Sequence, residues 1–254
     1  RDGTVIGAVN SALLIDTLIA GDASRAQFKA SDMTMIGSIS SNAAFIIATK
    51  ESGVASIADV RTKGLIIGTT ALSSDSWLSA MAVKKSAKLD AFKIIPGYPG
   101  TREISLAMDR GEIGARIWDM ESLKAQKPEW MAPGAVHFLT QLAPKQMPEA
   151  PAGVKLAREE AADELDRQAL DIIFSNALAF RPYLAPPGVP ADKLKAMREA
   201  FAKVFQDPEF IEEGKKQKLD IGYGSGEEVQ KLVERLYATP KPVVERMIKA
   251  MQVK

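Results

Sequence analysis

Short apolar runs alternate with segments of helical periodicity along most of the chain. A continuous run of about four to eight apolar residues predicts a buried strand, whereas apolar residues recurring every three or four positions predict an amphipathic helix. The predicted strands are residues 5–9, 33–36, 44–49, 65–67, 92–95, 115–118, 136–142 and 178–184. The predicted helices are residues 12–19, 57–60, 76–86, 101–110, 121–127, 158–174, 191–205, 207–217, 226–237 and 240–253. Strands that alternate with helices are typical of an α/β fold with a largely parallel sheet.

Two of the predicted strands run into loops of similar character. Strand 65–67 leads into a loop rich in hydroxyl groups, strand 92–95 leads into a loop with two glycines, and a helix follows each loop. The first turn of a helix leaves backbone N–H groups unpaired and carries partial positive charge, so it can bind an anion without a basic side chain. The candidate ligand-binding residues in these loops are Thr69, Thr70, Ser73, Ser74, Tyr98, Gly100 and Thr101. The alternatives are ordinary helix capping for the hydroxyls, a tight turn for the glycines and a place in the core for Tyr98.

A further set of candidates follows other predicted strands. Asp119 directly follows strand 115–118. Its side chain either contacts a carboxylate ligand, in its protonated form or through a water molecule, or caps the next helix. Arg116, inside that strand, is expected to point away from the ligand. The remaining candidates are Asn10, Ser11, Ser41, Asn42, Phe180 and Arg181. Capping is the alternative for Asn10 and Ser11, and Arg181 either pairs directly with a carboxylate or is solvated at the surface.

The composition removes several classes of function. The 254 residues include no cysteine and one histidine, which excludes disulfides, thiolate catalysis, zinc–thiolate centres and sites with several histidines. Lysine and arginine number 33 against 32 aspartate and glutamate, so the charge gives no reason to expect nucleic acid as a partner. We find no nucleophile–base pairing, P-loop or dinucleotide-binding glycine motif, and we expect no cofactor and no metal. The first residues lack a signal-peptide pattern, which predicts a mature, cytoplasmic or trimmed start.

Six short motifs, spread over essentially the whole chain, carry a resemblance to a known family. They are residues 2–7 (DGTVIG), 97–100 (GYPG), 108–112 (MDRGE), 184–192 (LAPPGVPAD), 207–210 (DPEF) and 237–240 (YATP). In this ordered set the chain resembles the substrate-binding proteins of the tripartite tricarboxylate transporter family, also called the Bug family.

The resemblance implies a two-lobed periplasmic-binding-protein fold of type II, with a ligand cleft between the lobes. It implies a first lobe of residues 1–48 and 170–254 and a second lobe of residues 49–169. Family members carry a further strand–helix–strand portion before the position of Arg1, so we expect a first lobe without its usual N-terminal strands, most simply explained by trimming.

The leading hypothesis is therefore a periplasmic receptor without catalytic activity. The resemblance implies a monomer that closes on a small organic carboxylate and delivers it to integral-membrane permease subunits. Two alternatives stay open: an enzyme on the same scaffold, a lyase or transferase with Asp119 as general base, or a ligand-sensing subunit for a membrane signalling partner.

Overall fold

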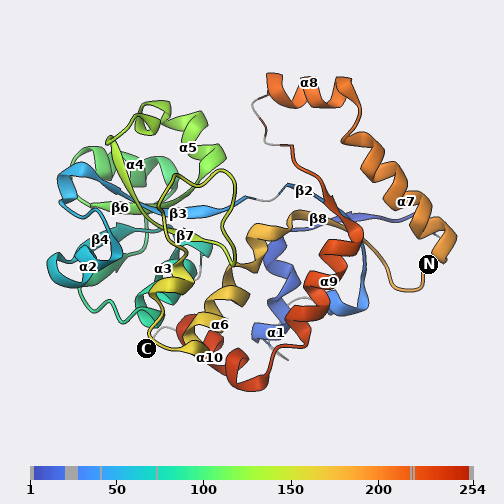
Figure 1. Cartoon of the computed structure of the whole chain (residues 1–254), viewed down its shortest axis with the longest axis horizontal. Coiled ribbons are helices and arrows are strands. Elements are labelled where there is room, and N and C mark those ends of the chain that lie inside the picture. The colour runs from blue at the N-terminus through green and yellow to red at the C-terminus, as the bar shows by residue number, and fades with distance from the viewer. Residues whose placement is uncertain are drawn as a thin grey trace. The chain divides into compact units, whose positions relative to one another are not determined.

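The computed structural model of the chain describes residues 3–20, 28–40, 42–72, 74–217, 219 and 221–251. It divides into two compact units, one made of Arg1–Asn42 and Ser175–Val244 and the other of Ala43–Phe174 and Glu245–Lys254 (Figure 1). The boundaries expected from the family resemblance lie near residues 48 and 170 instead, with the whole C-terminal tail in the first lobe. We call the two parts unit 1 and unit 2 and describe each by itself.

Unit 2 contains a five-stranded mixed sheet. Its strands are β3 (Ala44–Thr49), β4 (Leu65–Gly68), β5 (Phe92–Ile95), β6 (Ala115–Asp119) and β7 (Val136–Leu142). The strand order is β5-β4-β6-β3-β7. Strand β4 is parallel to both β5 and β6, whereas β3 is antiparallel to both β6 and β7. The carboxyl ends of β4, β5 and β6 therefore lie at the same edge of the sheet.

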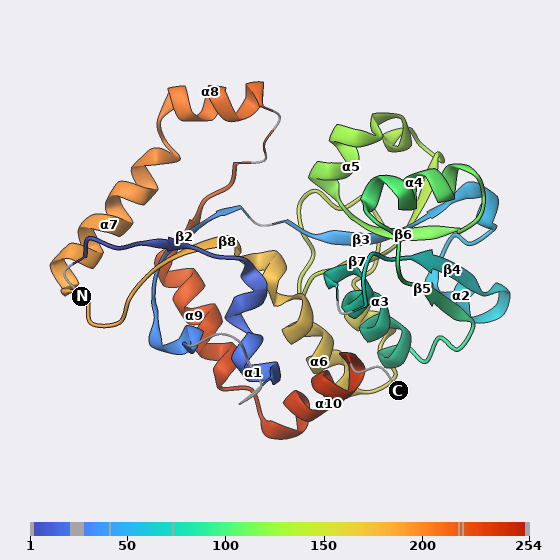
Figure 2. The same cartoon turned by 180° about the vertical axis from the view of Figure 1, so that it is seen from behind.

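Helices cover both faces of this sheet. They are α2 (Ile57–Lys63), α3 (Asp75–Ser86), α4 (Thr101–Asp109), α5 (Met120–Gln126) and α6 (Glu164–Ile173). Figures 1 and 2 show α4 and α5 on one face and α2 and α3 on the other. Helix α4 buries Ile104, Ala107 and Met108 against Ile113, which fixes the helix on the sheet through apolar burial. Gly111 follows α4 with φ of 71°, the left-handed conformation in which glycine ends helices without steric cost.

Unit 1 is built on a four-stranded antiparallel sheet. Its strands, in the order β1-β8-β2-β9, are β1 (Gly7–Ala8), β8 (Phe180–Ala185), β2 (Thr34–Ser40) and β9 (Gly224–Ser225). The helices of this part are α1 (Asp16–Ala20), α7 (Ala191–Val204), α8 (Pro208–Lys216) and α9 (Gly226–Tyr237), and α10 (Lys241–Met251) follows them. Helix α9 begins with a capping box in which Ser225 and Glu228 satisfy each other's backbone N–H groups.

The predicted α/β class is confirmed, but the prediction of a largely parallel sheet is wrong. Every strand pair of unit 1 is antiparallel, and β3 runs against both of its neighbours in unit 2. The alternation of strands and helices does not specify which sheet a strand joins. Strands β2 and β3 are consecutive yet enter different sheets, and β8 pairs with β2 although Ser40 and Phe180 are 140 positions apart in the sequence. Within the described residues no helix is both long and apolar enough to span a membrane.

Candidate functional site

The two loops singled out from the sequence lie side by side and are tied to each other. Strands β4 and β5 pair in register up to Gly68 and Ile95, so both loops leave the same edge of the sheet. The Gly97 N–H donates to the Thr70 carbonyl at 2.6 Å, and the Tyr98 N–H donates to the Thr69 carbonyl at 3.3 Å. The loops therefore form one connected rim, built mainly from backbone hydrogen bonds.

Much of the first loop serves the protein itself. Thr69 is fully buried, and its N–H donates to the Ile95 carbonyl at 2.9 Å. Ser74 is the N-cap of α3, where its hydroxyl accepts from the Trp77 N–H, and Ser73 lies outside the described residues. Asp75 lies in the first turn of α3, where its negative charge interacts favourably with the helix dipole. The hydroxyls of this loop thus act first as caps and ties.

The second loop leaves the first turn of α4 open. Gly100 is the N-cap residue and has no side chain that could accept from the first turn. Within the described part of the chain, the N–H groups of Thr101, Arg102 and Glu103 have no protein acceptor. Thr101 is exposed, so this helix end is accessible to solvent. The arrangement leaves three hydrogen-bond donors together with the positive end of a helix dipole, which is a favourable environment for an anion.

Asp119 ends β6 at the same edge of the sheet. Its carboxylate accepts from the Ser122 N–H at 2.8 Å and is the N-cap of α5. Of the two roles considered for Asp119, the cap is therefore observed. Contact with a ligand carboxylate remains a prediction.

Arg116, inside β6, is expected from the sequence to point away from the ligand. The structure buries its side chain to 2% exposure against the first turn of α4. One terminal nitrogen, Nη1, donates to the Thr101 carbonyl at 2.9 Å and to the Ser105 hydroxyl at 2.6 Å. The guanidinium carbon lies 3.6 Å from the centre of the Trp118 ring, a cation–π contact. The position of Arg116 among apolar residues of a predicted strand is the sequence feature that could have indicated a buried cation.

Tyr98 packs into the core of unit 2. Its ring lies against the cluster formed by Ile104, Ala107, Met108 and Ile113. A ring atom is 3.1 Å from the position that a Cβ on Gly68 would occupy, so the absence of a side chain there makes room for Tyr98. The side chain of Tyr98 therefore holds the second loop on the sheet, and a further role as a wall of the ligand site stays a prediction.

The candidates from unit 1 gather at one end of its sheet. Strands β1 and β2 both run towards the end of the sheet at which β8 begins, because each is antiparallel to β8. Asn10 caps a short 3₁₀ helix by accepting from the Ala12 N–H at 2.9 Å. Ser11 is buried at the start of that helix, and the Asn42 N–H donates to the Ala177 carbonyl. Ser41 lies outside the described residues.

Phe180 and Arg181 open β8 at the same end. Arg181 is exposed and has φ of 53°, a left-handed conformation that costs a residue with a Cβ roughly 1–2 kcal/mol. Its guanidinium lies 5.2 Å from the centre of the Phe180 ring. Strained backbone is often retained where it serves a function. The strain at Arg181 is therefore a second reason, besides its charge, to consider it a binding residue.

A cavity of about 370 Å³ lies at the opposite edge of the unit 2 sheet. Its lining includes residues just before and at the start of the parallel strands: Gly64, Leu65, Ala91, Lys93, Gly111, Glu112, Ile113 and Gly114. This cavity therefore lies away from the loops that carry the candidate residues.

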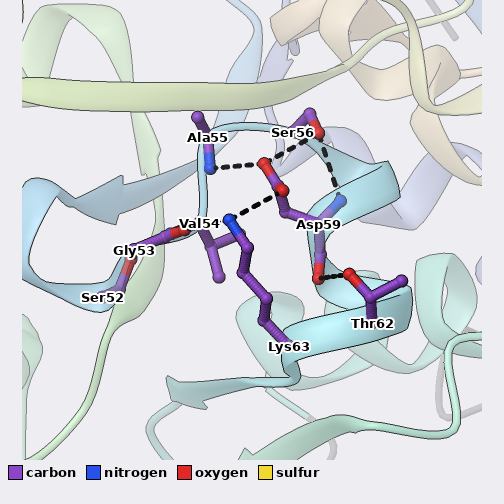
Figure 3. Close-up of polar contacts among 8 residues, drawn as sticks. All are labelled: Ser52, Gly53, Val54, Ala55, Ser56, Asp59, Thr62 and Lys63. Carbon is purple, nitrogen blue, oxygen red and sulfur yellow. Dashed lines mark hydrogen bonds and ion pairs between the residues drawn. The ribbon is translucent and has the colours of Figure 1, made fainter.

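Next to that cavity, the N-terminus of α2 is closed by a polar network (Figure 3). Asp59 accepts from the Ala55 N–H at 3.0 Å and from the Ser56 hydroxyl at 3.1 Å, and it pairs with Lys63 at 2.9 Å. The hydrogen bond from Lys63, followed by those from Ala55 and Ser56, lowers the pKa of Asp59 to about 2. The Ala55 N–H, the Ser56 hydroxyl and the Lys63 ammonium group are thus already bonded to Asp59.

Metal binding finds no support in the described parts of the chain. No group of three or more histidine, cysteine, aspartate or glutamate side chains there could hold a metal ion. No protein-family model and no curated protein matches the sequence.

Solved structures, in contrast, resemble the chain over nearly its full length. A TctC solute-binding protein from Polaromonas, 15% identical, covers 98% of this chain and 79% of its own at a TM-score of 0.71. The protein Rpa4515 from R. palustris, solved with adipate, is 17% identical, with coverage of 97% of this chain and 78% of its own and a TM-score of 0.60. MatC from Rhodopseudomonas palustris with bound malate is 15% identical, with coverage of 99% and 80% and a TM-score of 0.58.

The chain has the fold of a TctC-type solute-binding protein. At these identities the likeness establishes the fold, and it confirms at that level the resemblance read from the sequence motifs. A shared fold does not identify the residues that bind a ligand, so these must be inferred from the residues of this chain.

Proposed function

We propose that this chain is a solute-binding receptor for a small organic carboxylate, located in the periplasm and serving a tripartite-type membrane permease. The observation that carries the proposal is the open first turn of α4, where Thr101, Arg102 and Glu103 present N–H groups without protein acceptors. A carboxylate offers two acceptor oxygens and a negative charge, which suit these donors and the helix dipole. The rim of tied loops around α4 holds the donors in place before a ligand arrives.

The shared fold supports the same class of ligand. The R. palustris structure with adipate and the MatC structure with malate both hold dicarboxylates. In this proposal the unit 1 residues Asn10, Ser11, Asn42, Phe180 and Arg181 contribute to the same function. The role of Asp119 is then to cap α5 and not to act as a general base.

Thermal unfolding in the presence of single acids tests the proposal. The panel contains succinate, malate, adipate, citrate and benzoate, each at millimolar concentration and constant ionic strength. A ligand present at 100 times its dissociation constant stabilises the folded state by about 2.7 kcal/mol, which raises the melting temperature by several degrees. The matched methyl esters or amides serve as controls. No upward shift with any acid of the panel would contradict the proposal.

A further inference from the structure

No carboxylate forms a direct ion pair with the buried guanidinium of Arg116 within the part of the chain that the structure describes, and the nearby charge of Asp119 offsets its burial only in part. Its Nη1 donates to the Thr101 carbonyl and the Ser105 hydroxyl, and its Nε donates to the Ile117 carbonyl at 3.4 Å. All of these acceptors are neutral. Burying a charge without a directly paired counter-ion is costly, so this arrangement calls for an explanation.

Another buried charged residue of unit 2, in contrast, has a direct ion-pair partner. Asp166, 5% exposed, pairs with Arg246 at 2.9 Å. The Arg246 side chain is reinforced by a second carboxylate, that of Asp163, at 3.1 Å. The chain thus pairs the buried Asp166 directly with a cation, whereas Arg116 contacts neutral hydrogen-bond acceptors and the Trp118 ring and has only the more distant charge of Asp119.

Arg116 stays protonated at neutral pH. Burial lowers its pKa to about 10, and the nearby charge of Asp119 acts in the opposite direction. A pKa three units above pH 7 leaves the guanidinium charged in nearly all molecules. The cation is therefore a permanent feature of this edge of the sheet.

The Arg116 guanidinium lies next to the open N–H groups at the start of α4. Its Nη1 touches the carbonyl of Thr101, the first residue of α4, whose own N–H is one of the three open donors. The guanidinium therefore lies on the carbonyl side of the residue whose N–H is open, and its positive potential adds to that of the helix end. Low dielectric in the interior strengthens this effect, because the intervening protein screens less than water does.

We propose that Arg116 is a positioning residue that makes the α4 site selective for a charged carboxylate over its neutral amide or ester. The guanidinium does not contact the ligand; it holds the first turn of α4 through Thr101 and Ser105 and supplies the positive potential beneath it. This inference rests on the proposed function, because it needs a carboxylate bound at α4.

The expected effect follows from the size of one charge. For an assumed separation of roughly 7 Å between a bound carboxylate and the guanidinium, and an effective dielectric constant near 20, one unit charge changes a dissociation constant by a factor on the order of 50. Solvent screening reduces this factor, so we expect the loss of the Arg116 charge to weaken carboxylate binding by at least about tenfold.

The test compares dissociation constants measured by calorimetry for four proteins. The wild type and the variants Arg116→Met, Arg116→Lys and Arg110→Met are titrated with adipate and malate, or otherwise with the tightest-binding acid of the thermal panel. Arg110 is the matched control because it lies just after α4, is exposed and pairs with Glu112. We expect Arg116→Met to bind at least tenfold more weakly, Arg116→Lys to recover most of the affinity, and Arg110→Met to stay within twofold of wild type.

Two outcomes separate the inference from the proposed function. Wild-type binding with Arg116→Met within twofold of it would overturn the role of Arg116 and leave the receptor intact. No binding of any acid by the wild type would overturn both. If Arg116→Met does not fold, the wild type alone decides: it should bind the acid at least tenfold more tightly than the amide of the same acid, and equal affinities would refute the inference.

Discussion

The N–H of Gly97 donates to the carbonyl of Thr70 across the two loops at the carboxyl edge of the unit 2 sheet, at 2.6 Å. This bond joins the loop after β4 to the loop after β5, and Gly97 reaches it with φ of 101°. A conformation with φ of this sign is available to glycine at little cost and is unfavourable for a residue with a Cβ. The rim that supports the α4 site thus depends on a glycine.

Replacing Gly97 with alanine should therefore destabilise the protein. We expect the free energy of unfolding to fall by about 1–2 kcal/mol, because alanine must adopt left-handed backbone or lose the bond to Thr70. Urea unfolding measures the change. Gly100→Ala is the control: Gly100 has extended backbone, and a Cβ there would meet only the flexible carboxylate of Glu103. Equal losses for both variants would contradict this account of the rim.

Acid should weaken the N-terminus of α2. The pKa of Asp59 is lowered from 3.8 to about 2 in the folded protein, so its ionised form is stabilised by folding. Its contribution to stability is fully present above about pH 4 and is lost as the pH falls towards 2. We expect Asp59→Asn to remove part of the pH dependence of stability in this window while leaving the slope above pH 5 unchanged. Denaturant unfolding at pH 2 to 6 measures it, and identical profiles for the two proteins would refute the assignment.

Arg181 offers a test that separates strain from ligand binding. Arg181→Gly removes both the side chain and the strain of φ at 53°. Lys88, with φ of 51°, provides the matched control, because Lys88→Gly relieves the same strain away from the candidate residues. We expect neither variant to lower the free energy of unfolding, because relief of about 1–2 kcal/mol offsets the greater backbone entropy of glycine in the unfolded chain. Carboxylate affinity should fall only in Arg181→Gly; unchanged affinity would remove Arg181 from the site.

Asp119 can be assigned to capping or to ligand chemistry by two substitutions. Asparagine is as good an N-cap as aspartate, whereas alanine loses the bond from the Ser122 N–H. We expect Asp119→Ala to lower the free energy of unfolding by about 1 kcal/mol and Asp119→Asn to leave it nearly unchanged. Carboxylate affinity should not decrease in Asp119→Asn, since a negative charge is removed from the site. A large loss of affinity in that variant would instead indicate a direct role for the carboxylate.

Local signals in the sequence were sufficient for most secondary structure. Strands 92–95 and 136–142 have the bounds expected from their apolar runs. The ends of helices follow equally local signals: Ser56 is the N-cap of α2, and Gly111, with positive φ, follows α4. These features depend on residues within a few positions of one another, which is why a single sequence could specify them.

Features that depend on distant pairing could not be read in the same way. The direction of β3 is decided by β6 and β7, which lie more than 60 residues further along the chain. The burial of Arg116 under α4 depends on how that helix packs on the sheet. The open donors of α4 were anticipated, but the use of the Thr69 and Gly97 N–H groups to tie the loops was not. Hydroxyl-rich loops have the same composition whether their groups face a ligand or the protein.

Amide spectra of the ¹⁵N-labelled protein test the central claim most directly. The backbone N–H resonances of Thr101, Arg102 and Glu103 are recorded during titration with the tightest-binding acid of the panel. A carboxylate bound at α4 forms hydrogen bonds to these groups, so their signals should shift downfield, saturate with the calorimetric dissociation constant and become protected from hydrogen exchange. Saturable binding that leaves these three resonances in place would contradict the account.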